Sequence, residues 1–272
     1  MLTGILDDLR LYRRLIGLSI RSQAQYKANL ITDIATYFFV TALEFTMVPL
    51  LFATFPTLLG WNLGEVALLY AVTSLCFGLG ELFGAGIDQF SETIRLGEFD
   101  RLLLRPVSAL LQVASSDFRL RRLGRLTEGV LIFIFALHLL PGFTWTPLKL
   151  ALLPLGILSG ALIFIAIMLL GATLCFWTVE TTEIINILTY GGREMLSWPM
   201  HIYNLAIQRI FIFIIPLAFG SYLPTCYLLD RPLPFGLPGW VAFCAPLPAL
   251  IVVLVSYTLW RFGIRHYQST GS

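Results

Sequence analysis

Long apolar stretches, separated by short polar turns, make up most of the chain. Apolar residues dominate five segments, which are Leu30–Phe55, Gly64–Ile87, Leu126–Leu140, Leu150–Trp177 and Trp240–Phe262. A helix needs about 20 such residues to cross the hydrocarbon core of a membrane. Because hydrocarbon solvates the outside of apolar helices and water does not, the pattern predicts an all-α integral membrane protein, with one transmembrane domain over residues 1–272.

An amphipathic segment precedes the first of these stretches. Leu2, Ile5 and Leu9 recur at steps of three and four residues, whereas Arg10 and Arg14 fall on other faces of a helix. Basic residues beside an apolar stripe suit the headgroup boundary of a membrane. We therefore expect residues 2–23 to form an interfacial helix within an amphipathic cytoplasmic segment, residues 1–28.

The region 178–239 has two interpretations. Hydropathy alone favours Leu205–Leu229 as the fifth span and leaves the residues before it as a cytoplasmic loop. In the other interpretation, Thr181–Pro199 is a polar span among other helices, and 201–229 is an outer re-entrant hairpin broken at Pro216 and at a second proline. Both interpretations place the two termini on the same side, because each leaves an odd number of crossings before the last helix.

Basic residues are distributed unevenly over the segments between the apolar stretches. The first 28 residues carry five Lys or Arg and the loop 88–126 carries seven, whereas the turns 56–63 and 141–148 carry none. An excess of Lys and Arg marks the cytoplasmic side of a membrane protein. We therefore predict that both termini and the loop 88–126 are cytoplasmic.

Composition agrees with a membrane protein. Apolar residues form 57% of the chain and charged residues 12%, against about a quarter charged in soluble domains. The net charge of +2 does not indicate a nucleic-acid partner. The four cysteines lack metal-ligand spacing, so we predict no metal site. A disulfide between Cys226 and Cys244 is the less favoured interpretation, because sequence does not establish its geometry.

The chain carries no recognisable catalytic motif. Its two lysines, Lys27 and Lys149, do not follow glycine, so the phosphate-binding loop of an ATPase is missing. The three histidines are scattered, and neither an HExxH nor a GxSxG motif occurs. Nothing in the chain argues for an enzyme or for a cofactor of its own.

The most distinctive polar segment lies in the predicted cytoplasmic loop. Gly97 and Pro106 bracket a short helix with acidic residues at its start and Arg105 at its end, which matches the helix macrodipole. Its mixed face of Phe99, Leu103 and charges is too apolar for a free loop and too short to span a membrane. Two interpretations remain open: a docking surface for another protein, or an interfacial helix that rests on lipid headgroups.

The order of these segments resembles that of type-2 ABC transporter permeases. The Gly-x-x-Asp-x-Leu-Leu-x-x-Pro run at Gly97–Pro106 is similar to the coupling helix of those permeases. Four further parts of the chain resemble one six-helix branch of the family: Phe176–Glu180, Trp198–Tyr203, Arg209 and Ile215–Phe219. The resemblance covers nearly the whole chain, and the order of the motifs carries most of its specificity.

The resemblance implies a fold. That fold has six transmembrane helices with Thr181–Pro199 as the fifth, an N-terminal amphipathic interfacial helix and a cytoplasmic coupling helix. Outer re-entrant helices, residues 201–239, come before the last span. The resemblance also implies a bacterial inner (plasma) membrane and export as the direction of transport.

The resemblance also implies partners and contact residues. The partners are separate ABC ATPase subunits, which carry the ATP and magnesium, and a second permease chain that is identical or similar to this one. The contacts with the ATPase would come from Gly97, Glu98, Asp100, Arg101, Leu103, Arg105 and Pro106.

Several ionisable residues fall in or near the apolar stretches, where a lone charge costs about 2.5–3.5 kcal/mol. We expect Asp33 and Glu180 to reach the cytoplasmic interface. Glu183 and Arg193 are separated by about 15 Å along a helix, so they cannot pair within one helix. We predict a translocation path or subunit interface at Glu183, Tyr190, Arg193 and Glu194.

The leading hypothesis is the permease subunit of an ATP-driven exporter, which forms its path as a dimer. The alternative is an ATP-independent secondary transporter or channel. That class predicts inverted repeats, and the Gly97–Pro106 run has no counterpart in the second half of the chain. A membrane enzyme would need convergent catalytic groups, which the scattered histidines and acids do not supply.

Overall fold

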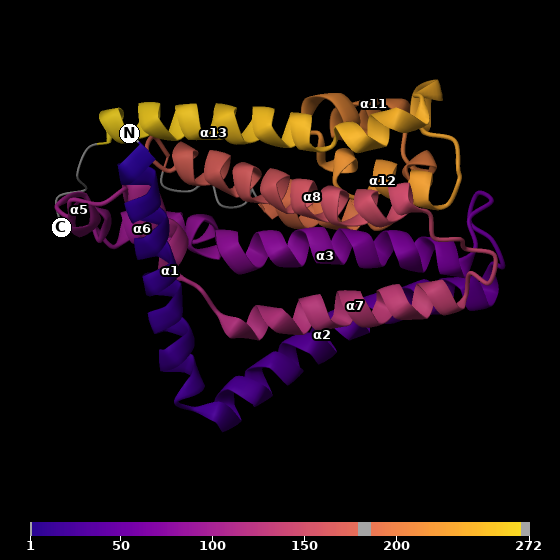
Figure 1. Ribbon diagram of the computed structural model, residues 1–272, viewed down its shortest axis with the longest axis horizontal. Helices are drawn as coiled ribbons and strands as arrows, with labels where there is room; N and C mark the ends of the chain where they lie inside the picture. The colour runs from indigo at the N-terminus through magenta and orange to yellow at the C-terminus, as the bar shows by residue number, and fades with distance from the viewer. Residues whose placement is uncertain (1, 179–185, 268–272) are drawn as a thin grey trace.

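The protein is a bundle of long helices that run side by side along one axis (Figure 1). The computed structural model describes residues 2–178 and 186–267, and the side chains from residue 10 onward within them. The long helices are α2 (Lys27–Thr54), α3 (Leu63–Asp88), α7 (Leu123–His138), α8 (Pro147–Leu174) and α13 (Pro246–His266). Over the described residues the regular elements are helical, so the all-α prediction is confirmed.

Four helices of the described chain are long and apolar enough to cross a membrane. They are α2, α3 with its continuation to Arg95, α8, and α13 with the 3-10 turn before it, and they coincide with four predicted spans. The predicted span at Leu126–Leu140 is α7, which has 16 residues. Its length of about 24 Å is shorter than the roughly 30 Å hydrocarbon core. The six-span fold therefore stays a prediction.

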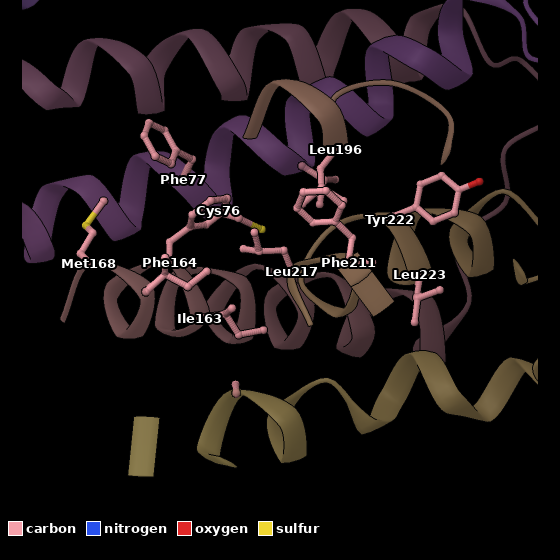
Figure 2. Packing of buried hydrophobic residues seen from close by; sticks show 14 of the residues in the cluster. Cys76, Phe77, Ile163, Phe164, Met168, Leu196, Phe211, Leu217, Tyr222 and Leu223 are labelled. Carbon is pink, nitrogen blue, oxygen red and sulfur yellow. The ribbon is translucent and has the colours of Figure 1, made fainter. Parts of the chain in front are cut away.

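Helix α3 lies between α7 and α8 at the centre of the bundle (Figure 1). Helix α13 covers α8, and α2 covers α7. Small residues bring α3 close to α8: a Cβ atom at Gly80 or Gly84 would stand 2.9 Å from Phe164 Cβ or Met168 Sδ. Beside this contact the rings of Phe77 and Phe164 meet edge to face at 5.1 Å (Figure 2). Close approach of this kind is how membrane helices gain packing energy without a hydrophobic driving force.

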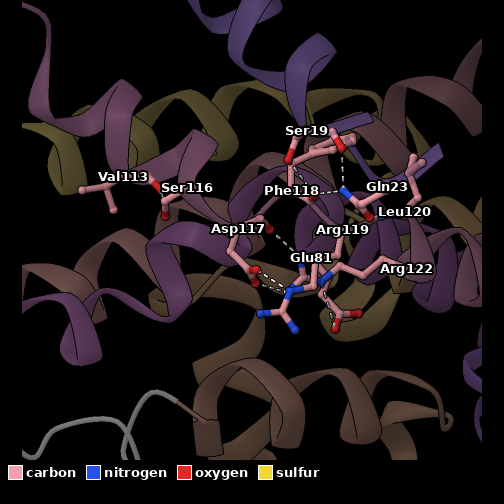
Figure 3. Close-up of polar contacts among 10 residues, drawn as sticks. All are labelled: Ser19, Gln23, Glu81, Val113, Ser116, Asp117, Phe118, Arg119, Leu120 and Arg122. Carbon is pink, nitrogen blue, oxygen red and sulfur yellow. Dashed lines mark hydrogen bonds and ion pairs between the residues drawn. The ribbon is translucent and has the colours of Figure 1, made fainter. Parts of the chain in front are cut away.

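Helix α1 (Leu2–Ala24) crosses one end of the bundle at a steep angle to the spans (Figure 1). Its carboxyl half is fixed to the loop before α7. Ser19 Oγ and Gln23 Nε2 donate to the Phe118 carbonyl at 3.3 and 2.7 Å, and Gln23 Oε1 accepts from the Leu120 N–H at 2.9 Å (Figure 3). The predicted helix at residues 2–23 is therefore present and is held against the bundle.

The loop between α3 and α7 folds into short helices at the same end of the bundle as α1 (Figure 1). These are α4 (Phe90–Arg95), α5 (Phe99–Leu103), α6 (Ala109–Ser116) and the 3-10 turn η1 (Leu120–Arg122). The carboxyl end of α13 reaches this end too, where the rings of Tyr267 and Phe99 meet at 5.0 Å. The described segments that we predicted to be cytoplasmic thus lie together.

Short broken helices cap the opposite end of the bundle. Helix α11 (Leu205–Arg209) continues through a π-helical turn to Ile214, and α12 (Tyr222–Leu228) follows after a bend of 76°. Pro216, which has no backbone N–H to donate, lies at the bend. Residues 205–228 therefore form either a broken span or a re-entrant hairpin, and not one straight span. The turns η6 (Pro234–Gly236) and η7 (Gly239–Cys244) lead from there into α13.

Ion pairs fasten this cap to the spans. Arg231 Nη2 lies 2.8 Å from Glu65 Oε2 at the start of α3. Lys149 Nζ, at the start of α8, lies 2.6 Å from Asp230 Oδ2. All four cysteines are free thiols, so the disfavoured disulfide between the cysteines of α12 and η7 is not formed.

The segment 181–199 is described from residue 186 onward. A π-helical turn, η2 (Ile187–Gly191), leads into α10 (Gly192–Leu196), which packs against α3. The hydroxyl of Thr73 on α3 donates to the Leu196 carbonyl at 3.2 Å inside the core. Burial among other helices is what the polar-span interpretation expects of this segment. Glu180 and Glu183 lie outside the described residues.

Candidate functional site

A left-handed glycine separates α4 from α5. Gly97 has φ +68°, a conformation that side chains with a Cβ atom rarely adopt. The N–H groups of Gly97 and Glu98 donate to the carbonyls of Ile94 and Thr93, each at 3.0 Å, which closes the end of α4. The chain therefore turns sharply at Gly97 and presents α5 as a separate short helix, in the place where the sequence predicted one.

One side of α5 and its flanking turns is exposed and partly apolar. Leu104, at the tip, is 86% exposed, and Leu96 and Leu103 are exposed as well. Four of the predicted contact residues, Glu98, Arg101, Arg105 and Pro106, are exposed around them. Exposed apolar side chains with a polar rim mark a surface that binds a partner or a membrane.

The other side of α5 points into the protein through Phe99, which is fully buried. Its ring meets the rings of Phe90 at 5.0 Å, Phe176 at 5.6 Å, Trp260 at 6.3 Å and Tyr267 at 5.0 Å. These five residues, which we call the aromatic junction, come from α4, α5, the turn after α8, α13 and the residue after α13. The junction therefore connects the exposed α5 to the carboxyl-terminal ends of α8 and α13.

The junction is tightly packed and includes a polar edge. A Cβ atom at Gly263 would stand 2.4 Å from Cδ2 of Phe176, so α13 accepts that ring directly against its backbone. Asp100 of α5 lies beside Tyr267, and burial together with this carboxyl raises the pKa of the Tyr267 phenol to about 12. The phenol is therefore neutral at any physiological pH. Asp100, a predicted ATPase contact, thus faces Tyr267.

Gln112 of α6 fixes the loop behind α5. Its side-chain Nε2 donates to the carbonyls of Leu102 at 3.0 Å and Val107 at 3.2 Å. These bonds hold both ends of the turn that carries Leu104. We did not predict a role for Gln112, because a single glutamine beside an apolar run carries no distinguishing signal in the sequence.

A second site lies inside the bundle, where charged side chains from five elements meet. We call it the charge network, and it consists of Glu44, Glu81, Arg122, Arg125, Glu128 and Arg193. Its members come from α2, α3, η1, α7 and α10. A buried charge is expensive unless it is paired, so the network ties these elements together.

Arg193 holds α10 to two spans. Its guanidinium, 3% exposed, places Nη1 at 2.8 Å from Glu44 Oε2 of α2, and Nη2 donates to the Tyr70 hydroxyl of α3 at 2.8 Å. It also pairs with the neighbouring Glu194 and lies 5.2 Å from the centre of the Tyr70 ring. Arg193, predicted to line a path or interface, is thus turned inward within this chain.

Arg125 and Arg122 extend the network toward α1. Arg125 Nη1 lies 3.6 Å from Glu44 Oε2, and its Nε lies 3.4 Å from Glu81 Oε2. Arg122 lies 3.7 Å from Glu81 and pairs with Asp117 at 3.0 Å (Figure 3). The loop that anchors α1 is therefore joined to the same charges that hold α10.

Three carboxylates of this region either lack a hydrogen-bond partner or stay partly exposed within one chain. Both oxygens of Glu128, which is buried, have no hydrogen-bond partner among the described residues. The side chains of Glu44 and Glu194 are 41% and 55% exposed. Glu44 lies about 15 Å from the end of α2, and a carboxylate at that depth in lipid would be costly.

The other predicted residues divide between exposed and undescribed positions. Tyr190, 39% exposed, packs its ring against Phe77 at 5.1 Å. Asp33 is exposed near the start of α2, as the interfacial prediction expects. Over the described residues, no group of three or more His, Cys, Asp or Glu side chains could hold a metal ion.

Comparison with known proteins places these features in one family. A family model described as ABC-2 family transporter protein matches residues 38–271. The match includes α5, the aromatic junction and the charge network. No curated protein and no solved structure matched the chain.

Proposed function

Because the chain belongs to the ABC-2 family of transporter proteins and is a membrane permease of an ABC transporter, we propose that it is the permease subunit of an ATP-driven exporter and forms half of its translocation path. The observation that carries this proposal is α5, which is exposed at Leu104 and buried at Phe99. A helix of this kind suits a permease that receives force from a separate ATPase. ATP and magnesium then belong to the ATPase subunits, and this chain contributes the path through the membrane.

Coupling runs through α5 in two steps. An ATPase subunit binds the exposed tip around Leu104, with Glu98, Arg101 and Arg105 as its polar rim. Movement of the ATPase displaces α5, and Phe99 passes the displacement to Phe176 and Trp260. Packed interiors transmit such shifts because they are dense and do not compress. The cytoplasmic ends of α8 and α13 therefore move together with α5.

A second permease chain completes the site around α10. Glu44 and Glu194 both pair with Nη1 of Arg193, and the side chains of both are about half-exposed. Protein or water must cover them, since lipid does not tolerate exposed carboxylates. An identical or similar chain against α2 and α10 supplies that cover, with Glu183, Tyr190 and Glu194 along the path or interface. Arg193 holds Glu194 in place through their ion pair.

The proposed topology has six crossings with both termini in the cytoplasm of a bacterium. The lysine and arginine excess at the α1 and α5 end of the bundle supports the orientation. The burial of Arg193, Leu196 and Ser197, together with the packing of α10 against α3, supports a fifth crossing at 181–199. The 76° bend supports an outer re-entrant region within 201–239.

Docking at the tip of α5 is tested by a variant with Arg101→Ala and Leu104→Ala. We expect at least a thirtyfold loss of the co-purified ATPase, since an anchor residue in an interface contributes about 2 kcal/mol or more. The candidate ATPase is to be sought among the products of neighbouring genes, as a soluble chain with a Walker A motif. The control is Glu92→Ala with Arg95→Ala, which removes an exposed ion pair from neighbouring α4 and leaves the tip of α5 intact. Equal ATPase recovery in both variants would contradict the docking proposal.

Topology is tested by single cysteines in a variant without native cysteines. Ile202→Cys, at an exposed site after α10, should react with an impermeant maleimide in intact cells. Thr57→Cys between α2 and α3 should react equally, whereas Ser22→Cys in α1 should react only after permeabilisation. If Ile202→Cys behaves like Ser22→Cys, residues 181–199 do not cross the membrane.

A further inference from the structure

Helix α1 carries a row of arginines around a glycine. Arg10, Arg14, Gly17 and Arg21 follow one another at steps of four, three and four residues, which places them on one face of the helix. Arg13 borders this face. Over the described residues, no carboxylate lies within ion-pair distance of Arg13, Arg14 or Arg21. These exposed charges are therefore available to an anionic partner from outside the described chain.

A hollow lies between these arginines. It has a volume of about 350 Å³ and is lined by Arg13, Arg14, Gly17, Leu18 and Arg21. Gly17 forms its floor, since no atom lies within 4 Å of the place where a Cβ atom would stand. The hollow is thus open and bordered by three arginine side chains, whose carbon stems together with exposed Leu18 make most of its lining apolar.

The orientation of α1 determines what this hollow faces. Ser19 and Gln23, on the opposite face of the helix, are bonded to the backbone of Phe118 and Leu120 (Figure 3). The arginine face is therefore turned away from the bundle. Because α1 crosses the ends of the spans at a steep angle (Figure 1), the helix runs along the plane in which lipid headgroups lie.

We propose that the hollow around Gly17 binds the phosphodiester of an anionic phospholipid. Guanidinium groups match phosphate oxygens in charge and geometry, and the glycine lets the phosphate approach the helix backbone. Leu18 lies where the lipid glycerol and the start of an acyl chain would pack. This site does not depend on the ATPase or on the direction of transport. It would make the position of α1, and of the loop bonded to it, sensitive to the lipid composition of the membrane.

The test separates a shaped site from general attraction between charges. The full chain is reconstituted in vesicles of equimolar phosphatidylcholine and phosphatidylglycerol, extracted in detergent and purified, and the bound lipids are measured by mass spectrometry. We expect phosphatidylglycerol to be enriched over phosphatidylcholine. Arg14→Gln with Arg21→Gln should weaken this binding about fivefold per arginine. Arg261→Gln with Arg265→Gln, which removes two exposed arginines from α13, should leave the enrichment unchanged.

The decisive variant is Gly17→Leu, which fills the hollow and keeps every charge. Leucine favours a helix more than glycine does, so α1 is expected to stay folded, and circular dichroism checks this. Enrichment should fall in Gly17→Leu as it does in the arginine variant. Wild-type enrichment in Gly17→Leu, or in the arginine variant, would overturn the proposal. Displacement of the lipid by inorganic phosphate, beyond that caused by chloride at equal ionic strength, would also overturn it in favour of a soluble anion.

Discussion

A Phe99→Ala permease should still bind its ATPase and yet fail to respond to ATP. The variant leaves the exposed residues of α5 in place and removes the ring that meets Phe176 and Trp260. Loss of a buried phenylalanine costs about 3–5 kcal/mol of packing, and here that packing is what joins α5 to α8 and α13. Trp260, 2% exposed, is the natural reporter once the other tryptophans are replaced by phenylalanine. We expect its emission to change on ATP addition in the parent complex and to stay constant in Phe99→Ala.

The comparison variants separate this effect from loss of docking or of fold. Arg101→Ala with Leu104→Ala should lose the ATPase itself, whereas Phe99→Ala should retain it. Phe99→Leu keeps an apolar side chain of similar volume and should recover most of the Trp260 response. If Phe99→Ala binds the ATPase and gives the full response, the aromatic junction does not transmit movement. That result would leave the docking proposal intact.

Loss of the Arg193 charge should strongly destabilise the bundle. Arg193→Met leaves Glu44 without its closest partner and removes the bond to the Tyr70 hydroxyl. Breaking a buried charge pair from one side costs about 3–5 kcal/mol. We expect the thermal midpoint of the purified permease in detergent to fall by about 10 °C.

A second substitution identifies the cause. Glu44→Gln in the Arg193→Met background removes the stranded charge and should recover part of the lost stability. Arg193→Lys keeps the positive charge but loses the forked geometry of the guanidinium. Its thermal midpoint should lie between that of the parent and that of Arg193→Met. Equal midpoints for Arg193→Met and the parent would mean that the charge network does not hold α10 in place.

Sequence patterns predicted the parts of the fold that depend on local composition. Span positions followed from apolar length, and the short helix α5 followed from Gly97 and Pro106, which stop a helix by local conformational rules. The bend between α11 and α12 was signalled by Pro216. The angle of the bend could not be predicted, because it depends on how closely Gly220 packs against Gly160 of α8 in the assembled fold.

The site depended more on tertiary contacts and was predicted less completely. A helix of five residues has no measurable periodicity, so the sequence did not show that Phe99 faces inward while Leu104 faces outward. Arg193 and Glu44 are far apart along the chain, and nothing local pairs them. Gln112 acts through two backbone carbonyls, which any residue type could provide. These contacts depend on the assembled fold.

The half-exposed carboxylates of Glu44 and Glu194 also bear on how the cell controls the amount of this protein. A single chain leaves both groups half-exposed, and the proposed second permease chain would cover them. Under this proposal, a copy made in excess of its partner exposes charge that lipid does not tolerate, and cells remove defective proteins through proteases. Assembly itself would then set the lifetime of each copy, and the ratio of subunits would be corrected after synthesis.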